Sequence, residues 1–199
     1  MEPNEKPTIV IDVDGVITNF SNEFAKYYNQ YKKPLHKPIS NNPPNWNFDL
    51  EGIELQCMYK MMNQFIMTDY EKLKYEYELL GNWASLTNKL ASKYKIIIVT
   101  SYPNHESRTK YLAHKGIIYN DIHFSNSSEK YEIIKKINPK FVVEDNPEII
   151  INLAKELPRS KILYPAIWKY LDHMPKTIRE QNLSNVSQYH NLEEFETLV

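Results

Sequence analysis

Two aspartates one residue apart, Asp12 and Asp14, follow an apolar run that starts at residue 8, and Gly15 comes directly after them. The run is typical of a central parallel strand covered on both faces, and open parallel sheets bind ligands at the carboxyl ends of their strands. Because side chains alternate along a strand and glycine lets the chain turn, both carboxylates can face one pocket. Two anions this close repel each other, and Mg2+, which prefers oxygen ligands, is their natural partner.

Two later apolar runs also end in polar side chains. The run from residue 95 ends in Thr100 and Ser101, and the run from residue 140 ends in Glu144 and Asp145. We expect all three runs to be parallel strands, so these side chains should gather at one edge of the sheet. The alternative role of the two hydroxyls is simply to cap the strand end. His105, in the loop that follows them, is expected to be solvated.

One lysine is well placed to join this group. Lys130 lies in the first turn of a helix expected at about residues 129–137, from which it can project back over the strand ends. Lys110, Lys115 and Lys135 are its rivals, but each is of the kind usually solvated on a helix surface. The sequence therefore favours Lys130 as the basic residue of the site.

This order of acidic pair, hydroxyl, lysine and second acidic pair resembles the four motifs of the haloacid dehalogenase superfamily, in its phosphatase branch. The resemblance implies that Asp12 is the nucleophile and Asp14 the general acid and base. It also implies that Thr100 holds a phosphate oxygen and that Lys130 neutralises charge on the nucleophile and the phosphate. Aspartate at position 14 favours phosphate ester hydrolysis, because the dehalogenase branch lacks it and the ion-pumping ATPase branch carries threonine.

The same resemblance implies a Mg2+ cofactor bound through Asp145, with Glu144 nearby. A phosphomonoester dianion repels an attacking carboxylate, so the site must add positive charge, which Mg2+ and one lysine can supply. The expected metal-binding carboxylates are those of Asp12, Asp14, Glu144 and Asp145.

The fold expected from these strands is α/β, a doubly wound parallel sheet with a small helical cap inserted after the first strand. Helical spacing at 20–31 and 50–68, with a proline-rich loop between them, marks residues 19–80 as the cap. Residues 1–18 and 81–199 should form the core domain. Further core elements are expected at about 82–94, 148–157 and 161–164, with an extended stretch near 186 and a closing helix from 192.

The start of the chain and its small cap resemble the 5′(3′)-deoxyribonucleotidase family and related candidate nucleotidases of bacteria and phages. In that family an aromatic ring at the position of Phe20 contributes to the nucleobase pocket, and the loop around Trp46 resembles a cap segment. Stacking on a base suits either ring, although an aromatic residue at helical spacing can equally be cap core. Ser101 and Tyr102 are the other expected substrate contacts. Asn146 stands where the nucleotidase pattern often has arginine.

The composition of the chain limits the classes of protein and of partner that remain. The chain has 199 residues, a formal net charge of −1 and one cysteine, Cys57, so it offers no disulfide framework and no general attraction to nucleic acid or to an anionic membrane. No signal peptide or membrane span is evident, and we expect a cytoplasmic protein. A homodimer is compatible with the sequence, which does not determine the oligomeric state.

The function expected from the sequence is that of a Mg2+-dependent phosphomonoesterase that acts on a small molecule, with a nucleoside monophosphate as the expected substrate. Two alternatives within enzymes are a phosphatase of another small phosphoester and one of nucleic-acid 3′ ends. A third, from another class, is a catalytically silent nucleotide-binding module, since fold does not fix function.

Overall fold

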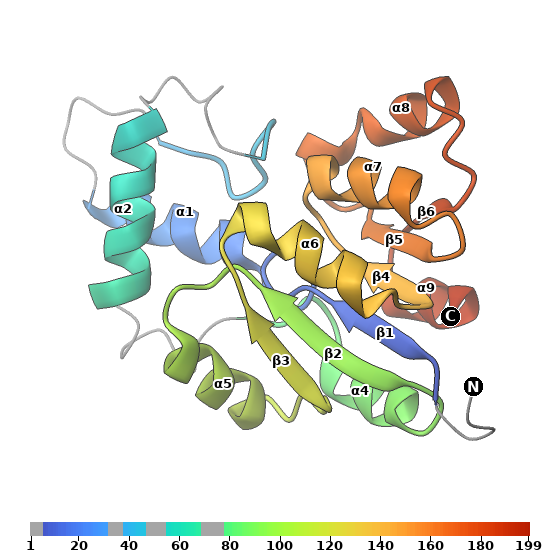
Figure 1. Ribbon diagram of the computed structural model, residues 1–199. Coiled ribbons are helices and arrows are strands. Elements are labelled where there is room, and N and C mark those ends of the chain that lie inside the picture. Colours follow the sequence, from blue (N-terminus) through green and yellow to red (C-terminus); the bar gives the residue numbers. More distant parts are fainter. Residues whose placement is uncertain (1–5, 32–37, 47–54, 69–77) are drawn as a thin grey trace.

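The protein, described here from a computed structural model, is built around a six-stranded parallel sheet with the strand order β3-β2-β1-β4-β5-β6 (Figure 1). The structure describes residues 6–31, 38–46, 55–68 and 78–199. The expected α/β doubly wound sheet is therefore confirmed. The strands are β1 (Thr8–Ile11), β2 (Lys95–Thr100), β3 (Asp121–Phe124), β4 (Phe141–Val143), β5 (Lys161–Pro165) and β6 (Val186–Tyr189).

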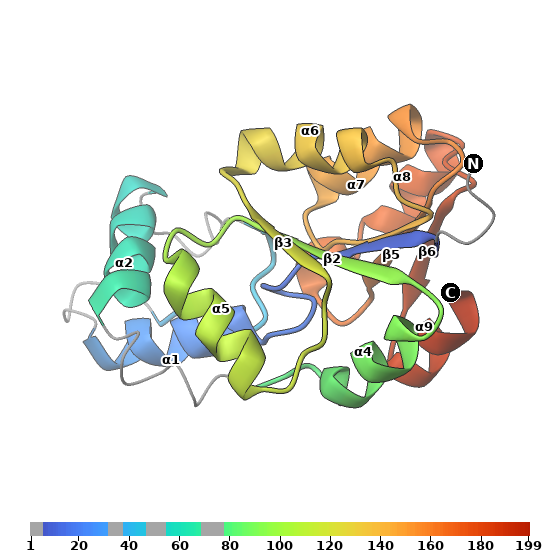
Figure 2. The same ribbon diagram turned by 60° about the horizontal axis from the view of Figure 1, so that its bottom comes forward.

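Helices cover both faces of the sheet (Figure 2). On one face lie α4 (Trp83–Ala91), α5 (His105–His114) and α9 (Leu192–Leu198), and on the other lie α6 (Ser127–Ile137), α7 (Pro147–Glu156) and α8 (Met174–Glu180). A single 3-10 turn, Lys169–Leu171, follows β5. No helix of the described part of the chain is long and apolar enough to cross a membrane.

The central strand β1 contributes to both halves of the core. Ile9 and Ile11 pack in the cluster under α4 and α9, whereas Val10 packs in the cluster under α7. All three side chains are buried, which is why the strand is apolar without alternation.

The order in which successive strands are placed in the sheet reverses at β1. The chain runs from β1 outward through β2 to β3, then crosses to the other side of β1 and continues through β4 and β5 to β6. β1 and β4 are neighbours, with Ile11 paired to Val143, and the Asp12 amide donates to the Val143 carbonyl at 3.0 Å. In such sheets the crevice at this reversal, outside the carboxyl ends of the strands, is the usual ligand site.

Two helices, α1 (Phe20–Tyr31) and α2 (Leu55–Thr68), lie beyond the carboxyl ends of the strands (Figure 1). The chain leaves the core at Thr18 and returns at Leu79, and an isolated antiparallel bridge joins these two residues. The Asn19 amide also donates to the Glu78 carbonyl at 3.0 Å. This pairing supports an inserted segment at 19–80, although the division into core and cap stays a prediction. The expected helical residues 50–54 lie outside the described part of the chain.

The sequence did not predict β3 or α8. β3 has four residues, two of them polar, at the edge of the sheet, and its side chains are only partly buried or exposed, so no apolar run marks it. The run at residue 140, expected as the third strand, is therefore the fourth along the chain. Most other elements lie within a few residues of the expected bounds.

Candidate active site

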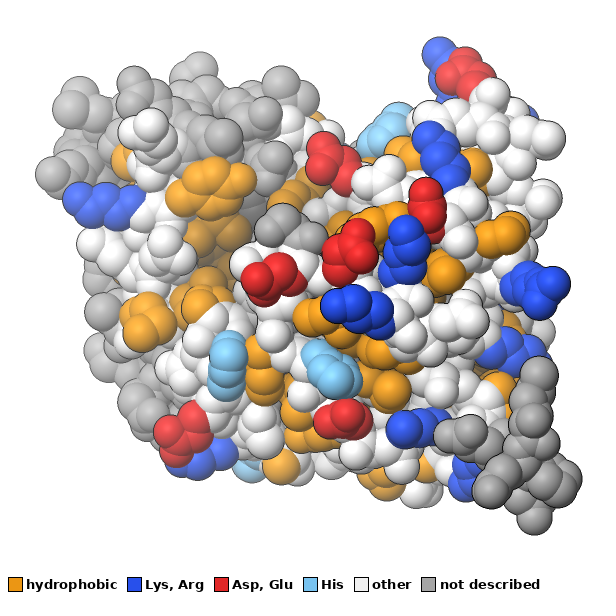
Figure 3. Space-filling view, viewed as in Figure 1, with side chains coloured by type: hydrophobic (Ala, Val, Ile, Leu, Met, Phe, Trp, Pro, Cys, Tyr) orange, Lys and Arg blue, Asp and Glu red, His pale blue; other side chains and the backbone are white. Residues whose placement is uncertain are grey.

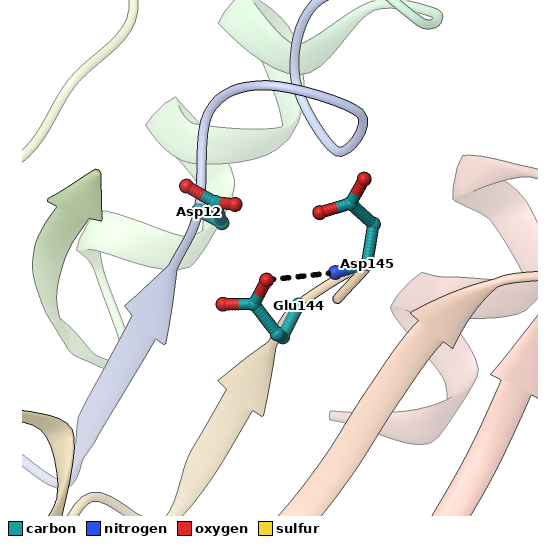
Figure 4. A group of neighbouring side chains, drawn as sticks. All are labelled: Asp12, Glu144 and Asp145. Carbon is teal, nitrogen blue, oxygen red and sulfur yellow. Dashed lines mark hydrogen bonds between the residues drawn. The ribbon is translucent and has the colours of Figure 1, made fainter. Parts of the chain in front are cut away.

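Three buried carboxylates meet where β1 and β4 end. Asp12 follows β1, Glu144 and Asp145 follow β4, and one oxygen from each side chain lies within 4.8 Å of the others. Figure 4 shows the three side chains directed toward one another. The parallel register of the two strands creates this group, because it brings their ends to the same level.

Gly15 allows the chain after β1 to pass close to this group. Its φ is +79°, which favours glycine, and a Cβ at this position would lie 2.0 Å from Oδ2 of Asp145. The Trp168 indole donates to the Gly15 carbonyl at 2.7 Å and ties the turn to the segment after β5. A side chain at position 15 would therefore displace Asp145.

Lys130 lies between the carboxylates, as the sequence predicted from its place at the start of a helix. Its Nζ is 2.6 Å from Oδ2 of Asp12 and 2.8 Å from Oε2 of Glu144, and the side chain is buried. Asn126 and Glu129 form a reciprocal cap that sets the start of α6. Lys135, the alternative to Lys130 on the same helix, instead pairs with Glu156 of α7 on the surface.

Glu144 is held from three sides. Its Oε1 accepts from the backbone amides of Asp145 and Asn146 at 3.2 and 3.0 Å, while its Oε2 forms the ion pair with Lys130. With both oxygens engaged, Glu144 acts on the site mainly by placing the lysine. Asn146 itself caps α7 through its side chain.

Burial dominates the electrostatics of the group. It raises the pKa of Asp12 to about 7, against the lowering effect of Lys130, and it raises the pKa of Asp145 well above its ordinary value. Burial alone would lower the pKa of Lys130, but the carboxylates of Asp12 and Glu144 raise it overall. Three acidic groups thus face one ammonium, and a divalent cation would offset the excess negative charge.

Asp145 has a further buried partner. The Tyr170 hydroxyl donates to its Oδ2 at 2.6 Å, and the Tyr170 ring stacks on Trp168 with centroids 5.8 Å apart. The sequence placed these two aromatic residues near the entrance to the site, with packing as the default explanation. The structure shows that Tyr170 lines the cavity and positions Asp145 directly.

Asp14 lies apart from the carboxylate group. Nη2 of Arg108 contacts its two oxygens at 2.7 and 2.8 Å, and the Thr18 hydroxyl donates to its Oδ1 at 3.1 Å. Burial raises the pKa of Asp14, and Arg108 opposes that rise. The structure therefore does not place Asp14 with the three grouped carboxylates, and its expected role as a metal ligand stays a prediction.

A cavity of about 710 Å3 lies over these residues. Asp12, Asp14, Lys130 and Asp145 form its floor, while Phe20 of α1, Tyr59 of α2 and Trp46 of the segment 38–46 also line it. Ser101 and Tyr102 also line it, so the structure brings together all four residues expected to contact substrate. Figure 3 shows the hollow between the apolar side chains of the α1 and α2 region and the rest of the molecule.

Thr100 differs from its neighbour in exposure. Its side chain is 0% exposed, it does not line the cavity, and its Oγ1 has no hydrogen-bond partner among the described residues. The hydroxyl of Ser125, whose amide donates to the Thr100 carbonyl at 3.1 Å, is likewise buried and without such a partner, and Ser125 lines the cavity. Two buried hydroxyls, of which the sequence predicted only one, thus belong to residues that a backbone hydrogen bond joins at the ends of β2 and β3.

Phe20 has neighbours on α1 and α2 as well as a place at the cavity. Its ring lies 6.1 Å from that of Phe24 and 5.8 Å from that of Phe65, centroid to centroid. Trp46 is 37% exposed. The two rings proposed for base stacking therefore differ, since Phe20 also belongs to the packing between α1 and α2.

Comparison with solved structures extends these observations. No protein-family model matches the sequence, and a search of curated proteins finds no significant match. A haloacid dehalogenase-like hydrolase from Streptococcus pneumoniae superposes with a TM-score of 0.64 at 14% identity, over 98% of this chain and 99% of that one. The chain has the haloacid dehalogenase fold.

Other structures with this fold superpose over nearly the whole chain. A candidate phosphoglycolate phosphatase from Lactobacillus delbrueckii subsp. bulgaricus gives a TM-score of 0.63 at 12% identity and covers 98% of both chains. A candidate haloacid dehalogenase-type hydrolase from Bacillus subtilis, bound to magnesium, gives a TM-score of 0.56 at 13% identity over 98% of this chain and 99% of that one. At these identities the likeness concerns the haloacid dehalogenase fold and not the substrate.

Sequence reasoning missed Arg108 as well as Ser125. His105 is exposed, as expected, and its ring stacks on Phe124 with centroids 4.1 Å apart, so that both rings line the cavity. Arg108 is buried against Asp14. One signal could have indicated it, because the chain has only three arginines among 24 basic residues and arginine is the residue suited to a buried pair with a carboxylate.

Proposed function

We propose that this protein is a Mg2+-dependent phosphomonoesterase that acts through an aspartyl phosphate on Asp12, with nucleoside monophosphates as substrates. The observation that carries the proposal is the site of Asp12, a buried carboxylate 2.6 Å from the Lys130 ammonium at the floor of a cavity with an aromatic opposite wall. A carboxylate nucleophile beside fixed positive charge suits attack on an anionic phosphoryl group.

The metal site of this proposal consists of Asp12 and Asp145, with Glu144 behind them. Their oxygens lie close enough to share one cation, and the excess of negative charge over Lys130 favours a divalent one. When bound, Mg2+ would neutralise charge on the phosphoryl group and on the attacking carboxylate. Tyr170 holds the Asp145 side chain in place for this role.

The reaction divides into two displacements at phosphorus. A carboxylate oxygen of Asp12 attacks the phosphorus atom and the bond to the ester oxygen breaks. Asp14, which enters this step with its carboxyl group protonated, gives the departing oxygen a proton. A water molecule then attacks the aspartyl phosphate while Asp14 takes its proton, which releases inorganic phosphate and restores both side chains. Lys130 stays charged throughout. The Ser125 hydroxyl, on a residue that lines the cavity, and the buried Thr100 hydroxyl have no partner among the described residues and would serve as donors to phosphoryl oxygens.

The cavity wall supports the nucleotide part of the proposal. A phosphate on the floor leaves the space toward Phe20, Trp46 and Tyr59 for the rest of the substrate. Aromatic rings stack on nucleobases with about 1–3 kcal/mol per base. A sugar phosphate would leave this apolar surface without a partner.

A hydrolysis screen with phosphate release as the readout tests the proposal. It should include ribo and deoxy nucleoside 5′- and 3′-monophosphates, sugar phosphates and 3′-phosphorylated oligonucleotides, each with Mg2+ and with excess EDTA. We expect the highest kcat/KM for a nucleoside monophosphate and no turnover in EDTA. Preference for sugar phosphates or oligonucleotides would contradict the proposed substrate class, and turnover in EDTA would contradict the proposed Mg2+-dependent mechanism.

A further inference from the structure

Arg108 is a buried cation behind the floor of the cavity. It lies on α5, its side chain is 3% exposed, and Nη2 lies 2.7 and 2.8 Å from the two oxygens of Asp14. Its guanidinium also stacks over the Tyr102 ring, 3.8 Å from the centroid. Asp14 and Tyr102 line the cavity but Arg108 does not, so it reaches the site only through its neighbours.

Stability does not readily explain an arginine at this place. Removing a charged side chain from water is costly, and buried ion pairs often give no more stability than apolar residues of similar volume. A planar guanidinium nevertheless has one property that apolar residues and lysine lack, because it can hold a carboxylate in a single orientation. Here one nitrogen, Nη2, contacts both oxygens of Asp14, and the stacking of the guanidinium plane on Tyr102 fixes the direction of that contact.

The other contacts of Asp14 leave one oxygen available to substrate. Oδ1 accepts from Arg108 and from the Thr18 hydroxyl, whereas Oδ2 accepts from Arg108. A carboxylate oxygen has room for two donors. Oδ2 therefore keeps one free position at a residue that lines the cavity. This position can hold the proton that is given to the leaving oxygen and, once that proton is gone, can accept the proton of the attacking water.

We propose that Arg108 is the positioning residue for Asp14, holding the carboxylate in the orientation in which it exchanges protons with the leaving oxygen and the attacking water. The inference rests on the proposed function, since it concerns the same site. Tyr102 supports the guanidinium from the cavity side. Misplacement of a catalytic group by about 1 Å can cost about 100-fold in rate. Loss of Arg108 should therefore lower kcat and leave KM and the Mg2+ requirement nearly unchanged.

A kinetic double-mutant cycle tests this inference. Arg108→Gln should lower kcat about 10- to 100-fold in the wild-type background. In the Asp14→Asn background the same change should alter kcat by less than about threefold, because an arginine that acts only through Asp14 has nothing left to position. Arg108→Lys keeps the charge but not the planar group, and should restore only part of the rate.

A matched variant on the same helix separates positioning from folding. Leu112 is buried on α5 and lies in the apolar core, so Leu112→Val should lower the melting temperature and leave kcat unchanged. If Arg108→Gln does not fold, Arg108→Lys takes its place in the cycle. Equal losses of kcat in both backgrounds would overturn the inference, as would a rise in KM with kcat unchanged.

The outcomes also distinguish this inference from the proposed function. Absence of phosphatase activity of the wild-type protein in the substrate screen would contradict both the proposed function and the positioning role. An active wild-type protein with additive effects of Arg108→Gln and Asp14→Asn would remove the positioning role alone.

Discussion

The floor and the wall of the cavity are built in different ways. Apart from Asp14, whose side chain is 26% exposed, the floor consists of buried side chains at the ends of β1 and β4 and at the start of α6. These are joined by ion pairs and hydrogen bonds of 2.6–3.2 Å. The wall consists of rings from α1, α2 and residues 38–46, and two of these rings, Trp46 and Tyr59, are 37% and 46% exposed. A fixed charged floor suits a group common to all phosphoesters, and an exposed aromatic wall suits the part of the substrate that differs.

The wall is nevertheless attached to the core. Asn29 of α1 exchanges two hydrogen bonds with the backbone of Ile39, each 3.0 Å long. Asn42 accepts from the Lys169 amide at 2.8 Å and donates to the Ile167 carbonyl at 3.0 Å. The segment that carries Trp46 is therefore held both by α1 and by the loop after β5.

The largest effect is expected at Asp12. Asp12→Asn removes the nucleophile that the floor is built around, so phosphate release should fall to background for every substrate. The exposed Asp172, in the loop after β5, provides the matched control, and Asp172→Asn should retain wild-type activity. Near-normal turnover by Asp12→Asn, with the fold intact by circular dichroism, would show that the floor has another function.

A smaller but still large effect is expected at Lys130. Lys130→Ala should lower kcat about 10²–10³-fold, because one preorganised positive group at the phosphoryl site is lost. Lys135→Ala is the control on the same helix, since Lys135 pairs with Glu156 on the surface. The floor would also lose stability, as Asp12 and Glu144 would be left buried without their cation, so melting temperatures should accompany the rates. Equal activity of the two variants would argue against a catalytic lysine.

The floor could be predicted from the sequence because its parts are local. Asp12 and the pair Glu144 and Asp145 each follow an apolar run directly, and the rule that parallel strands end at one edge brings them together. Lys130 could be chosen because a helix start near the strand ends directs its side chain toward them. None of these inferences required a contact between side chains to be known in advance.

The wall and the arginine could not be derived in this way. Arg108 and Asp14 are 94 residues apart, and no periodicity of α5 indicates that this helix turns a charged side chain inward. Whether Phe20 faces a ligand or other rings depends on how α1 packs on α2, which the pattern of apolar residues leaves open. The orientations of these side chains depend on contacts between helices and strands, whereas the sequence pattern predicts only the helices and strands themselves.

Binding of Mg2+ offers a test of the floor without turnover. A ligand that binds the folded state alone at 100 times its dissociation constant stabilises it by about 2.7 kcal/mol, so Mg2+ should raise the melting temperature of the wild-type protein. Asp145→Asn should reduce or remove this shift, because Asp145 is one of the three carboxylates of the group. Trp46→Ala, in the wall, should show the full shift. A wild-type melting temperature that does not respond to Mg2+ would contradict the proposed metal site.

The smallest effect, and the one that bears most on substrate, is expected in the wall. Trp46→Ala should lower kcat/KM for a nucleoside monophosphate by the factor that corresponds to about 1–3 kcal/mol if a base stacks on the ring. Hydrolysis of a small phosphoester without a base should hardly change. Phe20→Ala should show the same contrast together with a lower melting temperature, because Phe20 also packs on Phe24 and Phe65. Trp46 is therefore the cleaner test. A parallel decline of both substrates, together with the melting temperature, would make the rings part of the packing between α1 and α2, and the nucleotide assignment would lose its support while the phosphatase assignment remained.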